Sequence, residues 1–172
     1  MTDTLTIEQF ATLLRVTPAI LQRELAALPI EITRFRPAPG EWSINEVIGH
    51  MIEAEQRGFA GRIQRILAEE QHICQTWDPN QVAEARGDTN KTAVALWQTF
   101  AALREQSIAL VLALQPEQLT QRGQHPAVGE LSIGALLYEW VYHDRNHFKQ
   151  IESNIQAWFW PQLGNAQRFY EI

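Results

Sequence analysis

The sequence contains a single cysteine, Cys74, among its 172 residues. One thiol can form neither an internal disulfide framework nor the cluster of cysteine ligands found in many structural zinc sites. An excess of positive charge is also missing, because 14 lysines and arginines stand against 20 aspartates and glutamates, for a formal net charge of −6. Proteins that bind nucleic acid neutralise its phosphates with a basic surface. The composition therefore argues against a nucleic-acid partner.

Long apolar runs are absent as well. The longest, Ile108–Leu114, is far shorter than the roughly 18–20 residues of a membrane span. The first residues carry neither the basic stretch nor the apolar core of a signal peptide. We therefore expect a cytoplasmic protein with no membrane attachment. Only 9 glycines and 8 prolines are present and 45% of the residues are hydrophobic, which excludes a disordered or low-complexity chain.

Two capping patterns and one proline divide the N-terminal half into helices. Thr6 and Ser43 are each followed three residues later by Gln or Glu, the pattern of a capping box in which side chain and backbone bond reciprocally at a helix start. Pro18 predicts that a short first helix ends at Thr17 and that a second spans residues 18–28, because proline fits a first helical turn but disrupts a helix interior.

The remaining apolar spacing is helical throughout, and no alternating run predicts a confident strand. We expect long helices over 43–70, 90–114 and 132–159, a short helix after Asp78-Pro79, and a long loop over 115–130. The predicted fold class is all-α: one domain over 1–172, an antiparallel four-helix bundle with short additional helices.

Three histidines are candidates for a metal site. His143 and His147 lie four residues apart at the edge of the apolar stripe of helix 132–159, so they stack on one side of that helix. His50, flanked by apolar residues in helix 43–70, is the candidate third ligand. Three imidazoles leave a coordination position for water or substrate, which is the pattern of catalytic sites. The alternative is half-exposed histidines bonded to backbone or carboxylates, and His72 and His125 are expected to face solvent.

Charged residues also occupy positions that the spacing assigns to the core. Glu55 and Arg62 lie on the apolar face of helix 43–70, and Asp144 lies on that of helix 132–159. Buried charges are rarely left unpaired. We therefore expect a buried Glu55–Arg62–Asp144 network that fixes helix register and orients His143. The alternative is a rotation of one helix face that brings these side chains to water.

Several of these residues fall in motifs similar to those of a known family. Pro39-Gly40-Glu41-Trp42-Ser43-Ile44-x-Glu46-Val47-Ile48-x-His50 resembles the second-helix signature of the DinB-like (DinB/YfiT) superfamily, and Glu53-x-Glu55-x-x-x-Phe59-x-x-Arg62 continues it. Gly129-Glu130-Leu131-Ser132, followed by Trp140-Val141-x-His143-Asp144-x-x-His147-x-x-Gln150-Ile151, resembles the last-helix signature. Thr17-Pro18-x-x-Leu21 matches the usual opening, so the resemblance covers nearly the whole chain.

The resemblance implies a four-helix bundle, commonly a homodimer, with a divalent ion held by His50, His143 and His147. The ion is zinc, nickel or iron in different members. Some members resemble S-transferases or isomerases that use a low-molecular-weight thiol such as bacillithiol, mycothiol or glutathione. Three imidazoles accept several transition metals, so the residues alone do not select one.

Two function classes follow. The first is a metal-dependent thiol S-transferase or hydrolase acting on a small-molecule substrate, with Glu53 and Glu139 as candidate proton acceptors or hydrogen-bond partners. Both carboxylates are equally compatible with a solvated surface position, and Cys74 has little around it that would activate a nucleophile. The second is a non-catalytic helical module, in which a metal braces the bundle or a small ligand is sensed.

Overall fold

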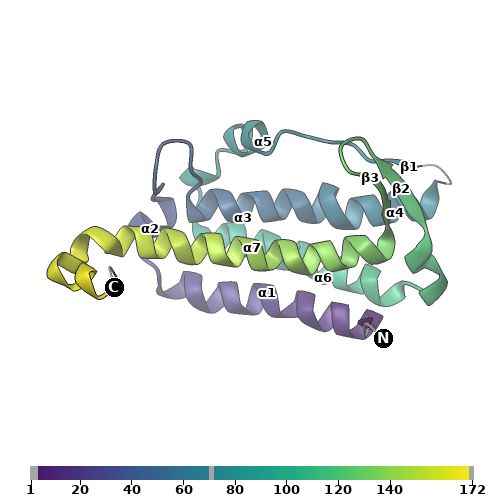
Figure 1. The fold of residues 1–172 in the computed structure, drawn as a ribbon, viewed down its shortest axis with the longest axis horizontal. Helices are drawn as coiled ribbons and strands as arrows, with labels where there is room; N and C mark the ends of the chain where they lie inside the picture. The colour runs from purple at the N-terminus through teal and green to yellow at the C-terminus, as the bar shows by residue number, and fades with distance from the viewer. Residues whose placement is uncertain (1–3, 70–71, 171–172) are drawn as a thin grey trace.

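The computed structural model describes residues 4–69 and 72–170, and four long helical rods dominate it (Figure 1). The first rod is α1 (Ile7–Ala27); the second joins α3 (Ile44–Glu53), a π-helical turn η1 (Ala54–Phe59) and α4 (Ala60–Ala68). The third and fourth are α6 (Ala93–Ala113) and α7 (Ile133–Phe159). Helices α1 and α3 each pack against both α6 and α7. The predicted four-helix bundle is confirmed.

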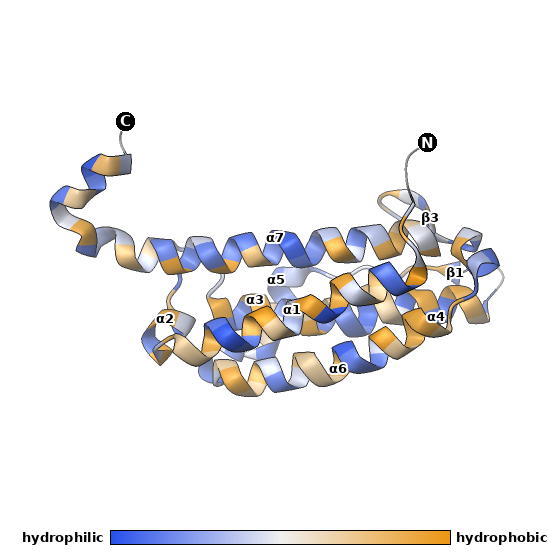
Figure 2. Ribbon diagram, turned by 90° about the horizontal axis from the view of Figure 1, so that it is seen from below, coloured by the Kyte–Doolittle hydropathy of each residue, from blue (hydrophilic) through white to orange (hydrophobic). Residues whose placement is uncertain are grey.

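Shorter elements complete the fold. Helix α2 (Ile30–Arg34) precedes the loop that leads to α3, and the 3-10 turn η4 (Trp160–Tyr170) extends past the end of the bundle (Figure 2). No helix in the described part of the chain is both long enough and apolar enough to cross a membrane.

The helix starts follow the predicted capping chemistry. Thr6 and Ser43 both form complete capping boxes, with Gln9 and Glu46 as the reciprocal partners. The Ser132 hydroxyl accepts a hydrogen bond from the backbone N–H of Ala135 and caps α7. Each cap satisfies donors that an N-terminal turn leaves unpaired. The predicted start of the last long helix is therefore confirmed to within a residue.

Pro18 does not end the first helix, so the predicted break after Thr17 is wrong. Helix α1 runs through Pro18, whose missing N–H frees the carbonyl of Leu14 one turn earlier. That carbonyl accepts a hydrogen bond of 2.9 Å from Nη1 of Arg104 on α6. A partner from another helix thus replaces the bond that proline removes, and α1 continues.

The same arginine is the centre of a buried ionic network. All five N–H donors of Arg104 are used: two go to Glu55 at 2.7 and 2.9 Å, two to Asp144 at 2.6 and 3.0 Å, and one to Leu14. The Thr17 hydroxyl also donates to Asp144, at 2.6 Å. Burial alone would lower the pKa of Arg104, but the two carboxylates raise it above its ordinary value. The guanidinium therefore remains charged inside the bundle.

Arg62 is not the partner of these carboxylates, and the prediction that placed it in the network is wrong. The π-turn is the reason. The Ala60 N–H bonds to the Glu55 carbonyl five residues back, so one extra residue enters the helix between Glu55 and Arg62. In an α-helix two residues seven apart lie on one face. The inserted residue turns Arg62 outward by roughly 100°, and Arg104 from α6 occupies the space.

The connection from α4 to α6 runs back along the outside of the bundle (Figure 1). It contains β1 (His72–Ile73), α5 (Pro79–Arg86) and the turn η2 (Asp88–Asn90). Asn45, at the start of α3, donates to the carbonyl of Lys91 just before α6. Gly49 of α3 makes room for the carboxylate of Asp88, because a Cβ there would lie 1.8 Å from that oxygen. The second and third rods therefore start at the same end and run parallel.

A small sheet closes the opposite end. β2 (Arg122–His125) and β3 (Gly129–Ser132) form an antiparallel hairpin, and β1 pairs with β2 in parallel. The expectation of a long loop over 115–130 without strands is therefore wrong, since η3 (Pro116–Thr120) and the hairpin lie there. The strands are too short to show the alternating pattern from which strands are predicted.

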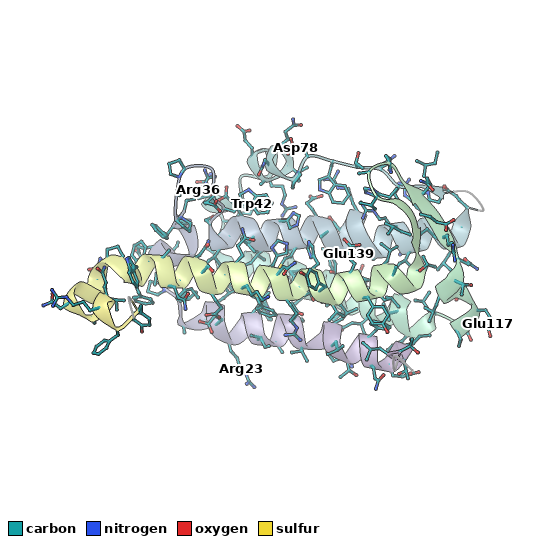
Figure 3. The ribbon with its side chains drawn as sticks, in the orientation of Figure 1. Arg23, Arg36, Trp42, Asp78, Glu117 and Glu139 are labelled. Carbon is teal, nitrogen blue, oxygen red and sulfur yellow. The ribbon has the colours of Figure 1, made fainter. Side chains whose placement is uncertain are left out.

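Replacement of Arg104 by methionine is expected to lower the free energy of unfolding by about 3–5 kcal/mol, because it leaves two buried carboxylates without their cation. Urea denaturation followed by circular dichroism measures the change. Arg23→Met on the exposed face of α1 (Figure 3) is the matched control, with a change within about 0.5 kcal/mol. A loss for Arg62→Met as large as that for R104M would contradict the assignment of Arg104 as the central cation.

Candidate metal centre

The structure brings His50, His143 and His147 together between α3 and α7. His50 lies in the last turn of α3, and the other two lie one turn apart on α7. Nε2 of His143 is 3.1 Å from Nε2 of His50 and 3.1 Å from Nε2 of His147. The three ligand atoms all lie within 4.8 Å of one another. Three ring nitrogens therefore converge on one point.

These rings are held in a largely desolvated setting. The Trp42 ring lies 5.0 Å from the His50 ring, and Phe59 packs its ring against His143 at 5.1 Å. Burial lowers the pKa of His50 to about 4, with a further lowering from His147. Burial, helped by the two neighbouring imidazoles, lowers the pKa of His143 to about 2. Burial also lowers the pKa of His147. All three rings are neutral near pH 7 and carry a free lone pair.

Gln150 sets which nitrogen of His147 is available. Its Oε1 lies 2.9 Å from Nδ1 of His147, one turn away on α7. An amide oxygen only accepts, so Nδ1 carries the proton and Nε2 keeps its lone pair. Such a bond from the outer nitrogen is the usual means of fixing the tautomer and orientation of a metal-binding imidazole.

The three residues fit a divalent transition-metal ion. Two nitrogen ligands that each lie about 2.0–2.1 Å from one ion are roughly 2.9–3.4 Å from each other. The shorter separation belongs to an octahedral N–metal–N angle and the longer one to a tetrahedral angle. The two Nε2 separations of 3.1 Å fall inside this range. Neutral imidazoles are also the protonation state that metal binding requires. His50, His143 and His147 would hold the ion, and its remaining coordination positions would be open.

The DinB superfamily model matches residues 13–151, a span that contains all three histidines. The chain belongs to the DinB superfamily. It is 24% identical over 136 residues to a protein of Oceanobacillus iheyensis named "Putative metal-dependent hydrolase", a match covering 79% of this chain and 78% of that protein. A Bacillus cereus protein of the same name is 23% identical over 114 residues, 66% of this chain and 65% of its own length.

The fold of this DinB-superfamily chain is that of YfiT from Bacillus subtilis. The TM-score is 0.79 at 18% identity, with 90% of each chain covered. YfiT is described as "a probable metal-dependent hydrolase with an unusual four-helix bundle topology". The parallel pair formed by the second and third rods is one departure of the present bundle from simple up-and-down connectivity.

The two histidines outside the cluster lie elsewhere. His125 is half-buried in β2, where its Nδ1 accepts a hydrogen bond from the Ala127 N–H. His72 was expected to face solvent, but it is only 2% exposed. Its backbone pairs with Gly123 of β2, and its Nδ1 lies 2.9 Å from a carboxylate oxygen of Glu69. The prediction for His72 is therefore wrong, because a two-residue strand that pairs with a distant one leaves no periodic pattern in the sequence.

The two candidate proton acceptors, Glu53 and Glu139, differ in whether their carboxylates are already bound. Glu53 accepts from Arg57 at 2.8 Å and from Arg86 at 2.9 Å, so it ties α5 to α3. Glu139 is exposed, one turn before His143 on α7, near the middle of the bundle (Figure 3). Cys74 is 1% exposed, and burial raises the pKa of its thiol. Of these three residues, Glu139 alone is exposed, and its role at the metal centre stays a prediction.

Sequence reasoning missed Arg104 and Thr17, both of which position the site by holding Asp144. Asp144 lies next to His143 in the chain, so the network sets the rotation of α7 that points the histidines at α3. Arg104 lies four residues after Phe100 and four before Ile108, both buried. A charge on an apolar stripe was the signal that identified Glu55 and Asp144, and it was present here too.

Replacement of Gln150 by alanine is expected to weaken metal binding by about tenfold to a hundredfold, because the His147 ring loses the partner that fixes its tautomer. Competition against a chromophoric chelator measures the dissociation constant. Gln156→Ala, at an exposed position on the same helix, should leave it unchanged. Equal affinities for the Q150A and Q156A proteins would contradict this role.

Proposed function

We propose that this chain is a divalent-metal-dependent enzyme acting on a small molecule, with hydrolysis as the leading reaction. The convergence of three neutral imidazoles from two helices carries the proposal. The names of the relatives in Oceanobacillus and Bacillus support the reaction class. The expected partner is a small-molecule substrate, and homodimerisation remains a prediction from the family resemblance.

A divalent ion in such a site lowers the pKa of a water or thiol that it binds, so that a nucleophile forms near neutral pH. The protein's own groups supply the rest. His50, His143 and His147 would hold the ion, Gln150 orients His147, and Trp42 and Phe59 cover two sides of the rings. Glu139 is the carboxylate that can accept or return a proton beside the site.

A thiol S-transferase is the related alternative within the same chemistry. The resemblance to thiol-using members supports it, with bacillithiol, mycothiol or glutathione as the thiol. The two reactions differ in the nucleophile alone: water in one, a thiol sulfur in the other. A screen that offers each nucleophile to an ester and to an alkylating electrophile separates them.

A non-catalytic metal brace is the second candidate, and one observation favours it: the histidines link α3 to α7 as a structural ion would. The two candidates differ in what chelation does. For an enzyme with an open site, the metal-free protein keeps its fold and loses turnover. For a brace, chelation lowers the melting temperature strongly, and no esterase or thiol-conjugating activity is found in the loaded protein.

Alanine substitution of any one of the three histidines is expected to abolish stoichiometric metal binding, because two imidazoles bind an ion far more weakly than three. Mass-spectrometric metal analysis of protein purified without a histidine tag measures the content. His125→Ala, which alters a histidine outside the cluster, should retain about one ion per chain. Full metal content in the H50A protein would contradict the three-histidine assignment.

Glu139→Gln is expected to lower kcat by about a hundredfold or more while metal content stays unchanged, because the amide cannot exchange a proton. The substrate is the best ester or electrophile from the screen. Glu152→Gln, exposed on the same helix, is the control and should keep full activity. An undiminished kcat in the E139Q protein would show that Glu139 takes no part in the reaction. The proposal that the three histidines bind a metal ion would be unaffected.

A further inference from the structure

A second polar site lies beside the π-turn, on the outside of the α3–α4 rod. A pocket of about 110 Å³ opens there between α4 and the segment that follows β1. Three arginines line it, Arg57, Arg62 and Arg65, and no carboxylate does among the described residues. Arg57 is paired with Glu53 at 2.7 Å, whereas the described residues offer no ion-pair partner to Arg62 or Arg65. These two arginines therefore leave positive charge at the pocket, which attracts anions.

Trp77 holds two of these guanidinium groups in place. The guanidinium carbon of Arg57 lies 4.9 Å from the centre of the Trp77 ring, and that of Arg62 lies 5.4 Å from it. The two arginines are five residues apart, the spacing that aligns side chains across a π-turn. Stacking on an aromatic face orients a guanidinium and leaves its in-plane N–H groups free to bind oxygens.

Two buried polar atoms of the pocket residues lack partners within the described part of the chain. They are Nε of Arg62 and Nε2 of His72. The His72 side chain is only 3% exposed, and its Nδ1 lies 2.9 Å from a carboxylate oxygen of Glu69. A carboxylate accepts, so Nδ1 carries a proton; in the tautomer with that one proton, Nε2 is an acceptor. Buried polar groups without a partner are costly, so a ligand that bound these two atoms would remove that cost.

We propose that this pocket binds a phosphate group. Arg62 and Arg65 would bind its anionic oxygens, and Nε2 of His72 would accept a hydrogen bond from its remaining O–H. Hydrogenphosphate and singly protonated phosphate monoesters offer both kinds of oxygen, whereas sulfate and carboxylates near pH 7 offer acceptors alone. A pocket of about 110 Å³ is large enough to hold a phosphate group.

The pocket is separate from the metal centre. Arg62 follows His50 by twelve residues on one continuous helical rod, a rise of roughly 18 Å at 1.5 Å per residue. The phosphate proposal therefore stands independently of any metal-dependent activity. A test on metal-free protein distinguishes its failure from a failure of the proposed function.

Isothermal titration of chelator-treated protein with inorganic phosphate, phenyl phosphate, sulfate and acetate tests the proposal at low ionic strength. We expect saturable binding of phosphate with a dissociation constant at least tenfold lower than that of sulfate. Acetate is expected to bind more weakly than sulfate. If phenyl phosphate binds as tightly as inorganic phosphate, the ligand is an organic phosphate monoester. If phenyl phosphate does not bind, the ligand is free phosphate. Absence of saturable phosphate binding, or sulfate binding as tight as phosphate, would overturn the proposal.

Amino-acid substitutions distinguish specific phosphate binding in this pocket from non-specific attraction of anions to positive charge. Arg62→Met is expected to weaken phosphate binding at least tenfold, and Arg62→Lys nearly as much, because lysine keeps the charge but not the oriented Nε–H. Arg23→Met removes the same charge from the far face and should have no effect. Urea denaturation verifies that each variant is folded. Equal weakening by the R23M and R62M substitutions would show non-specific attraction and overturn the site.

Discussion

One buried guanidinium connects all four rods of the bundle. Arg104 on α6 bonds to Leu14 on α1, to Glu55 in the π-turn of the second rod, and to Asp144 on α7. Apolar side chains pack well at several rotations of a helix, since hydrophobic attraction has no direction. The five N–H donors of Arg104 point in fixed directions, and in a low-dielectric core a missed hydrogen bond is costly. They therefore do not allow the helices to rotate. The network therefore determines how each helix is rotated, and the remaining core packs around that arrangement.

The π-turn η1 connects the buried Arg104 network to the pocket on the outside of the α3–α4 rod. One additional residue between Glu55 and Ala60 leaves Glu55 pointing inward and turns Arg62 outward, against Trp77. Gly61 is required in this turn, because a Cβ there would lie 2.2 Å from the Gln56 carbonyl oxygen. A regular α-helix would place both charges on one face and would remove the arginine-lined pocket. A single local irregularity thus separates a structural carboxylate from a surface site.

Much of this molecule was predictable from local chemistry, and the errors share one cause. The caps at Thr6, Ser43 and Ser132, the long helices and the stacking of His143 with His147 depend on spacing within one helix or one turn. The continuation through Pro18, the substitution of Arg104 for Arg62 and the burial of His72 depend on partners distant in sequence. Periodicity describes a helix by itself and contains no information on which side chain arrives from another helix.

Asp144 and His143 are adjacent in the chain but belong to different systems. The Asp144 carboxylate is bound by Arg104 and Thr17 inside the bundle, while the His143 ring meets His50 at the boundary between α3 and α7. The network fixes the rotation of α7 through Asp144, and this rotation directs His143 toward His50 on α3. Under the proposed function, this rigid support would keep the open coordination position in one geometry while ligands exchange.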